Sequence, residues 1–175
     1  MYIKVFLMSG ILVWITGFSG VGKTSIAEAL CGEMRKNKMS VVHVDGDMIR
    51  NLFPGLGYTL TDRLENAFRI ARICAMLTQQ GINVVCSTIS MFSEIHEFNK
   101  KQNKKCFEVL VNTDHEIVKS RDLRGIYKKN AEIVGVTQEY VLPKNPDLVI
   151  FNDIDNKQTE HAAKIFQSIK GKYDI

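Results

Sequence analysis

The segment GFSGVGKT occupies Gly17–Thr24 and fits the pattern G-x4-G-K-[ST]. It follows an apolar run that predicts a strand, and it precedes a segment with helical periodicity. In this pattern the glycines let backbone N–H groups wrap a phosphate chain, the lysine reaches the β- and γ-phosphates, and the last hydroxyl binds Mg²⁺. Lys23 and Thr24 would fill these two roles. The segment therefore predicts a phosphate-binding loop, and a glycine turn without a ligand is the alternative.

Apolar runs of strand length alternate with helix-period segments along the rest of the chain. The runs are continuously apolar and rich in β-branched residues, as is typical of strands buried on both faces of a sheet. Strands are predicted at Leu12–Thr16, Val41–Val44, Ile82–Ser87, Phe107–Val111 and Leu148–Phe151. Helices are predicted at Lys23–Arg35, Asp62–Gln80, Phe92–Lys101, Asp114–Ser120 and Thr159–Ile169. The alternation predicts an α/β fold of the P-loop NTPase type, a doubly wound parallel five-stranded sheet with helices on both faces.

A pair of carboxylates follows the second predicted strand, in the segment HVDGDMIR. Ligands of doubly wound sheets bind beyond the carboxyl ends of the strands, which places Asp45 and Asp47 at the same edge as the glycine-rich loop. One carboxylate could hold Mg²⁺ while the other accepts a proton from an attacking hydroxyl. An Asp-Gly turn that caps a helix is the alternative. His43 lies inside the strand and is interpreted as structural.

Composition and charge exclude several other classes of protein. The chain has 175 residues, 45% hydrophobic and 24% charged, with a net charge of +4. This mild excess does not predict a partner that is a nucleic acid or a membrane. The four cysteines form no CxxC pair, so we expect reduced thiols, no zinc site and a cytoplasmic protein. We expect a single domain over residues 1–175, with residues 1–7 as an N-terminal extension.

Several further segments, read in order, extend the pattern beyond the loop and the acidic pair. They are LGYTLTDRLEN at Leu56–Asn66, TIS at Thr88–Ser90, RDLRGIYKK at Arg121–Lys129 and PKNPDLVI at Pro143–Ile150. With these segments, residues 11 to 151 of the chain resemble the adenylylsulfate (APS) kinase family. The resemblance implies a kinase that uses ATP and Mg²⁺ to phosphorylate the ribose 3′-hydroxyl of adenylyl sulfate. It also implies a homodimer and a lid over residues 122–142.

The resemblance also implies roles for individual residues. Those implied for catalysis are Lys23, Asp45, Asp47 and Lys128, with Thr24 and Asp45 at the metal. Those implied for ATP binding are Gly17, Phe18, Ser19, Gly20, Val21, Gly22, Lys23, Thr24, Ser25 and Arg121. Those implied for acceptor binding are Asp47, Arg50, Tyr58, Arg63, Asn66, Ile89, Ser90, Lys129 and Val136. Independently, a spacing of three places Arg63 and Asn66 on one helix face. Without the resemblance, both would be interpreted as surface residues, and the lid lysines as solvated.

The chain departs from the family pattern on the acceptor side. Met91 replaces a proline, Ser93 and His96 replace arginines, and Val136 replaces a phenylalanine in a lid that is shorter than usual. The opposing aromatic residue is Tyr58. With Val136 in place of phenylalanine, only one aromatic ring is left to stack on the base. Stacking on an aromatic ring is worth ~1–3 kcal/mol per base, so this loss argues against adenine recognition of the usual family type.

Two acceptors therefore stay open: adenylyl sulfate, and a cytidine-activated compound such as the cytidine diphosphoramidate of capsule phosphoramidate synthesis. Three other functions are alternatives to a kinase of the APS-kinase type: a non-catalytic nucleotide-binding module, an ATP hydrolase, and a kinase of the shikimate or nucleoside-monophosphate type. None of these explains the acidic pair together with the later segments.

Overall fold

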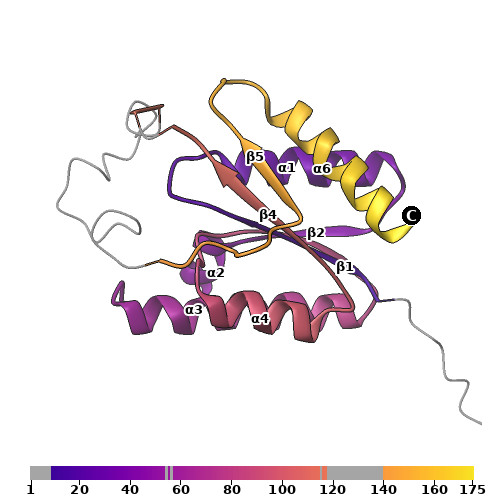
Figure 1. Cartoon of the computed structure of the whole chain (residues 1–175). Helices are drawn as coiled ribbons and strands as arrows, with labels where there is room; N and C mark the ends of the chain where they lie inside the picture. The colour runs from indigo at the N-terminus through magenta and orange to yellow at the C-terminus, as the bar shows by residue number, and fades with distance from the viewer. Residues whose placement is uncertain (1–8, 54, 56, 115, 118–139) are drawn as a thin grey trace, which may run out of the picture.

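The computed structural model describes residues 9–53, 55, 57–114, 116–117 and 140–175. Its centre is a five-stranded sheet in the order β2-β3-β1-β4-β5, and each neighbouring pair is parallel (Figure 1). The strands are β1 (Ile11–Thr16), β2 (Val41–Asp45), β3 (Asn83–Ser87), β4 (Lys105–Asn112) and β5 (Leu148–Phe151). The helices are α1 (Lys23–Lys36), α2 (Gly46–Leu52), α3 (Leu60–Gln79), α4 (Ser93–Gln102) and α6 (Gln158–Tyr173). The predicted doubly wound architecture is confirmed.

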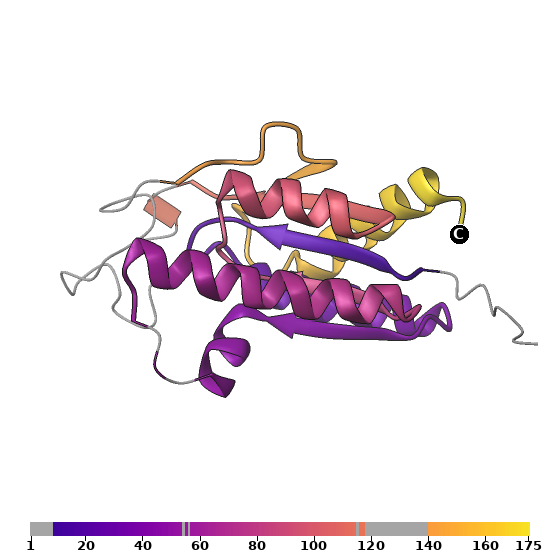
Figure 2. The same ribbon diagram turned by 90° about the horizontal axis from the view of Figure 1, so that it is seen from below.

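Helices cover both faces of the sheet. α1 and α6 lie together on one face, while α3 and α4 lie side by side on the other (Figures 1 and 2). β1 lies between these layers with all six residues buried. Its Val13 and Ile15 pack in the core under α1 and α6, and its Leu12 and Trp14 pack in the core under α3 and α4. A strand that is apolar on both faces can occupy only such a central position.

The expectation that every strand is buried on both faces is wrong for β2. In the described sheet β2 pairs only with β3, and the Val42 side chain keeps 38% of its surface exposed. An edge strand has one neighbour instead of two, so its side chains contact fewer covering residues. Phe151 of β5, at the opposite edge, is 64% exposed for the same reason.

Two helices begin with side-chain caps that the sequence supplies locally. Thr59 and Asp62 form a reciprocal capping box at the start of α3. Asp45 caps α2, a helix that was not predicted as an element of its own.

α6 continues beyond the predicted end at Ile169 to Tyr173. The helix predicted at Asp114–Ser120 falls mostly outside the described residues.

Among the described helices, none is both long enough and apolar enough to cross a membrane. The loops that follow β1, β2 and β3 all leave the carboxyl ends of adjacent parallel strands. The glycine-rich loop, the acidic pair and residues 88–92 therefore meet at one edge of the sheet.

Candidate active site

The glycine-rich loop connects β1 to α1, as predicted, and two of its glycines are required by close contacts. A Cβ at Gly17 would lie 2.3 Å from the Val111 carbonyl oxygen, and Gly17 has a φ of 150°. A Cβ at Gly22 would lie 2.5 Å from Asn152 Nδ2, and Gly22 has a φ of 91°. Gly22 caps α1 without any side-chain hydrogen bond. The N-cap residue thus leaves the first N–H groups of α1 without a side-chain cap of its own, and these groups and the helix dipole favour an anion.

Lys23 begins α1 and turns back over its own loop. Its ammonium Nζ donates to the Phe18 carbonyl oxygen at 2.6 Å. The positive charge is thereby held at the loop, in a half-buried position at the start of the helix. This is where a β- or γ-phosphate oxygen would need it.

Thr24 and Asp45 come together from different elements. Thr24 Oγ1 donates to Asp45 Oδ2 at 3.1 Å, although the two residues lie 21 positions apart in the sequence. The other carboxylate oxygen, Asp45 Oδ1, accepts from the backbone N–H groups of Asp47 at 3.0 Å and Met48 at 3.3 Å. One carboxylate oxygen of Asp45 thus caps α2, as the alternative interpretation predicts, while the other faces Thr24.

Asp45 stays ionised because hydrogen bonds outweigh its burial. Burial alone would raise the pKa of its carboxyl, but the bonds from Ser87, Thr24 and two backbone N–H groups lower that pKa below its usual value. Ser87 Oγ donates to Asp45 Oδ2 at 2.7 Å and so must accept from His43 Nε2, which lies 2.9 Å away. His43 thus supports the carboxylate through Ser87.

The hydroxyl and carboxylate fit a magnesium ion, which prefers oxygen ligands and keeps several waters and substrate phosphates in its shell. No group of three or more His, Cys, Asp or Glu residues gathers as a metal cage in the described part of the chain. Thr24 and Asp45 would therefore hold Mg²⁺ together with the phosphates, and not alone. Asp47 lies exposed in the first turn of α2, beside this pair.

Arginine and tyrosine side chains gather between α2 and the start of α3. Arg50 Nη1 donates to the Gly57 carbonyl at 2.7 Å, and Arg63 Nε donates to the Tyr58 carbonyl at 2.9 Å. The Arg50 and Arg63 guanidinium carbons lie 4.7 and 5.5 Å from the Tyr58 ring centroid. A base that stacks on Tyr58 would therefore share the ring with these cations. We call Arg50, Tyr58 and Arg63 the cationic cluster.

Asn66 lies one turn after Arg63 and is 95% buried, since only 5% of its surface is exposed. Its Oδ1 has no hydrogen-bond partner in the described structure. The alternative interpretation as a surface residue is therefore wrong for Asn66.

The connection from β3 to α4 places Ile89 and Ser90 next to the end of β1. The Ile89 carbonyl accepts from Thr16 Oγ1 at 2.7 Å, and the buried Ser90 hydroxyl lies 2.8 Å from Thr88 Oγ1. Both residues are thus fixed at the same sheet edge as the glycine-rich loop.

His96 replaces an arginine of the family pattern, and the structure explains where its side chain goes. It is 7% exposed and forms a short contact through Nδ1 with the carboxylate of Glu108, which is 2% exposed. Lys100 Nζ lies 3.5 Å from the second oxygen of Glu108. His96 therefore pairs with β4 beneath α4.

Four predicted site residues, Arg121, Lys128, Lys129 and Val136, lie outside the described residues, as does the lid except for residues 140–142. Two residues that contact the loop were missed. Tyr140 packs edge-on against Phe18 with ring centroids 4.9 Å apart, and Asn152 Nδ2 donates to the Val21 carbonyl at 2.9 Å. Neither belongs to a local motif, so the sequence carries no signal for these contacts.

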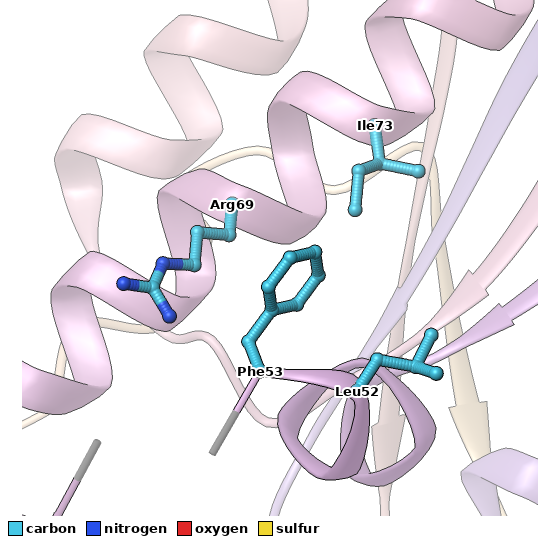
Figure 3. A pocket seen from close by; sticks show the side chains of 4 residues that line it. All are labelled: Leu52, Phe53, Arg69 and Ile73. Carbon is cyan, nitrogen blue, oxygen red and sulfur yellow. The ribbon is translucent and has the colours of Figure 1, made fainter. Parts of the chain in front are cut away.

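The structure also contains a cavity of about 530 Å³. It is lined by Leu52, Phe53, Arg69 and Ile73, between α2 and α3 (Figure 3). Arg69 lies over the Phe53 ring at 5.7 Å. None of the predicted site residues lines this cavity. The candidate site is therefore not this cavity but the sheet edge around the glycine-rich loop.

Comparison with known protein families identifies the family of this chain. A family model described as adenylylsulphate kinase matches residues 9–151. The chain belongs to the APS kinase family. Its members are phosphotransferases, and the P-loop kinase fold described above is theirs.

Similar curated proteins carry two different activities in their names. A cytidine diphosphoramidate kinase from Campylobacter jejuni is 35% identical over 164 residues, covering 90% of this chain and 95% of the relative. An adenylyl-sulfate kinase from Clostridium kluyveri is 40% identical over 164 residues, covering 89% and 81%. Another from Gloeothece citriformis is 36% identical over 166 residues, covering 91% and 94%. Sequence identity thus does not separate the two activities.

A solved structure of an APS kinase supports the same family assignment. The Mycobacterium tuberculosis APS kinase in complex with AMPPNP and APS is 30% identical to this chain, with a TM-score of 0.84. The match covers 93% of this chain and 98% of that one. The shikimate kinase of Aquifex aeolicus, at 16% identity and a TM-score of 0.59, shares the fold alone.

Proposed function

We propose that this APS kinase family member transfers the γ-phosphate of MgATP to the ribose 3′-hydroxyl of an activated nucleotide such as adenylyl sulfate. The observation that carries the proposal is the bond between Thr24 and Asp45 at the mouth of the glycine-rich loop. It joins a hydroxyl and an ionised carboxylate where a phosphate-bound cation would lie. The cationic cluster beyond α2 supplies positive charge for an acceptor that carries phosphate or sulfate.

Each residue has a role in this proposal. The N-terminus of α1 and Lys23 bind the β- and γ-phosphates, and Thr24 and Asp45 hold Mg²⁺. When bound, Mg²⁺ supplies the charge that neutralises the transferring phosphoryl group. Asp47 orients the acceptor hydroxyl and accepts its proton. On the family pattern, Arg121 is included as an ATP-binding residue, and Lys128 and Lys129 are included as lid lysines that face the phosphates.

A cytidine-activated acceptor is the second candidate. It is favoured by the name of the Campylobacter jejuni relative, which covers nearly the whole chain. Val136, which occupies a position where the family has phenylalanine, also favours a smaller base. The homodimer, the single domain and the cytoplasmic location stay predictions for this chain.

The acceptor is tested by measuring ADP release with adenylyl sulfate, cytidine diphosphoramidate, shikimate, nucleoside monophosphates and water. The proposal expects turnover with one of the first two compounds and little with the others. ADP release that needs only water would identify a hydrolase, and strong turnover of shikimate would identify another class of kinase. Nucleotide binding with no turnover of any acceptor would favour a non-catalytic module.

Asp45→Asn is expected to raise the Mg²⁺ concentration that gives half-maximal activity. Asparagine keeps the cap of α2, because its side-chain oxygen can still accept from the backbone N–H groups of Asp47 and Met48. It loses the charge that attracts the cation. Asp153→Asn is the matched control, since Asp153 also accepts one backbone N–H at this sheet edge, from Asp114. An unchanged Mg²⁺ titration for Asp45→Asn would contradict the metal assignment.

Val136→Phe is expected to favour the purine acceptor. A second aromatic face would recover ~1–3 kcal/mol of stacking, which corresponds to about 5–150-fold in kcat/KM for adenylyl sulfate relative to cytidine diphosphoramidate. The ratio is measured for the wild type and the variant under the same conditions. A wild-type enzyme that already prefers adenylyl sulfate by several orders of magnitude would contradict the small-base acceptor.

A further inference from the structure

Asn152 follows β5 and is anchored to the end of β4. Its backbone N–H donates to the Asn112 carbonyl at 2.8 Å. Its own carbonyl accepts from Thr113 Oγ1 at 3.3 Å. These contacts hold the backbone of Asn152 at the carboxyl edge of the sheet, beside the glycine-rich loop.

The side chain of Asn152 spans from α6 to that loop. Its Nδ2 donates to the Val21 carbonyl at 2.9 Å, across 131 positions of sequence. Its Oδ1 lies 3.1 Å from Nε2 of His161, in the first turns of α6. An amide oxygen can only accept, so His161 must donate from Nε2–H. That donation determines which way the amide of Asn152 faces.

The environment of His161 favours this arrangement. Partial burial lowers the pKa of its ring, and the charges of Lys164 and Lys157 act in the same direction, although Glu160 opposes them. The ring is therefore neutral near pH 7 and carries a single proton. With that proton on Nε2, the ring donates to Asn152 as the geometry requires.

The bond to Val21 has a consequence for the next N–H group. In a planar trans peptide the C=O and the following N–H point in opposite directions. Because the Val21 carbonyl faces Asn152, the N–H of Gly22 must point away from Asn152. Gly22 leaves no room on that side, since a Cβ there would lie 2.5 Å from Asn152 Nδ2. Asn152 therefore determines the orientation of the Val21–Gly22 peptide, one residue before Lys23.

We propose that Asn152, oriented by His161, is a positioning residue that turns the Gly22 N–H toward the phosphates of the bound nucleotide. The inference rests on the proposed use of ATP. Asn152 and His161, which we call the brace, join α6 to the glycine-rich loop, and neither residue belongs to the cationic cluster. The brace acts on nucleotide affinity and not on the transfer step, because it orients a group that contacts the phosphates before and during transfer.

The test measures the Kd of AMPPNP and of ADP by calorimetry, for the wild type and for Asn152→Ala. Losing one hydrogen bond that orients the loop should weaken both affinities about 3–10-fold. Asn152→Asp should weaken them further, because a carboxylate cannot donate to Val21 and would repel the phosphates. At saturating ATP, kcat and the KM of the acceptor should stay near their wild-type values.

Asn103→Ala is the matched control. Asn103 is also a buried amide that joins two elements, accepting from Thr78 Oγ1 and donating to the Asn99 carbonyl. The Asn103→Ala variant should lose thermal stability without any change in nucleotide affinity. If Asn152→Ala does not fold, His161→Phe and His161→Gln decide the question, since glutamine can still donate to Asn152 and phenylalanine cannot. Weaker binding for His161→Phe with rescue by His161→Gln would then support the brace.

Two outcomes overturn the inference in distinguishable ways. Wild-type protein that binds neither AMPPNP nor ADP would contradict the proposed function, and the brace with it. Wild-type binding with unchanged affinities for folded variants of Asn152 or His161 would contradict the brace alone.

Discussion

Lys23→Ala is expected to lower kcat by about 10³-fold or more, because it removes the charge that neutralises the β- and γ-phosphates during transfer. The fold should survive, since Lys23 Nζ donates to a carbonyl of its own loop, at Phe18. Losing that bond should cost on the order of 1 kcal/mol of unfolding free energy. Turnover of the best acceptor and thermal unfolding without nucleotide are the two measurements.

Lys36→Ala provides the control for this experiment. Lys36 ends the same helix, pairs with Glu33 at 3.8 Å and is mostly exposed. Its removal changes the net charge by the same amount but should leave turnover unchanged. Activity of Lys23→Ala within about tenfold of the wild type would show that the loop does not bind the reacting phosphates as proposed.

Asp47→Asn is expected to abolish most phosphoryl transfer while ATP binding is retained. A positioned proton acceptor contributes typically about 10²–10⁴-fold, and asparagine keeps the size of the side chain but cannot take the proton. Asp47 is exposed in the first turn of α2, where losing its charge costs only about 0.3–1 kcal/mol of favourable interaction with the helix dipole. Single-turnover transfer and AMPPNP affinity separate the two effects.

The comparison with Asp45→Asn distinguishes the two carboxylates. Excess Mg²⁺ should restore activity to the Asp45 variant, which loses only affinity for the cation. It should not restore the Asp47 variant, which lacks the proton acceptor. Rescue of Asp47→Asn but not of Asp45→Asn would show that the roles are reversed.

The fold was predictable because its signals are local. The glycine-rich segment is one continuous stretch between a strand and a helix, and strand–helix alternation permits few architectures other than a parallel sheet. All five predicted strands are present in the structure, with ends that differ by at most a few residues. α2 was missed because Asp45 is both the last residue of β2 and the cap of the helix that follows.

The candidate site was only partly predictable. The spacing of Arg63 and Asn66 placed them on one helix face, but the burial of Asn66 depends on how α3 packs against the sheet. His96 departs from the family pattern, and its partner Glu108 was not identified, because residues of α4 and β4 meet only through the layering of the fold.

The sequence by itself determined the phosphate loop, the acidic pair and the parallel sheet, since each depends on residues that are neighbours in the chain or repeat with a regular period. Only the tertiary structure decided which distant groups support them. Thr24 meets Asp45 across 21 residues, and Val21 meets Asn152 across 131. Such contacts follow from the order β2-β3-β1-β4-β5, which brings strand ends together at one edge whatever their separation in the chain.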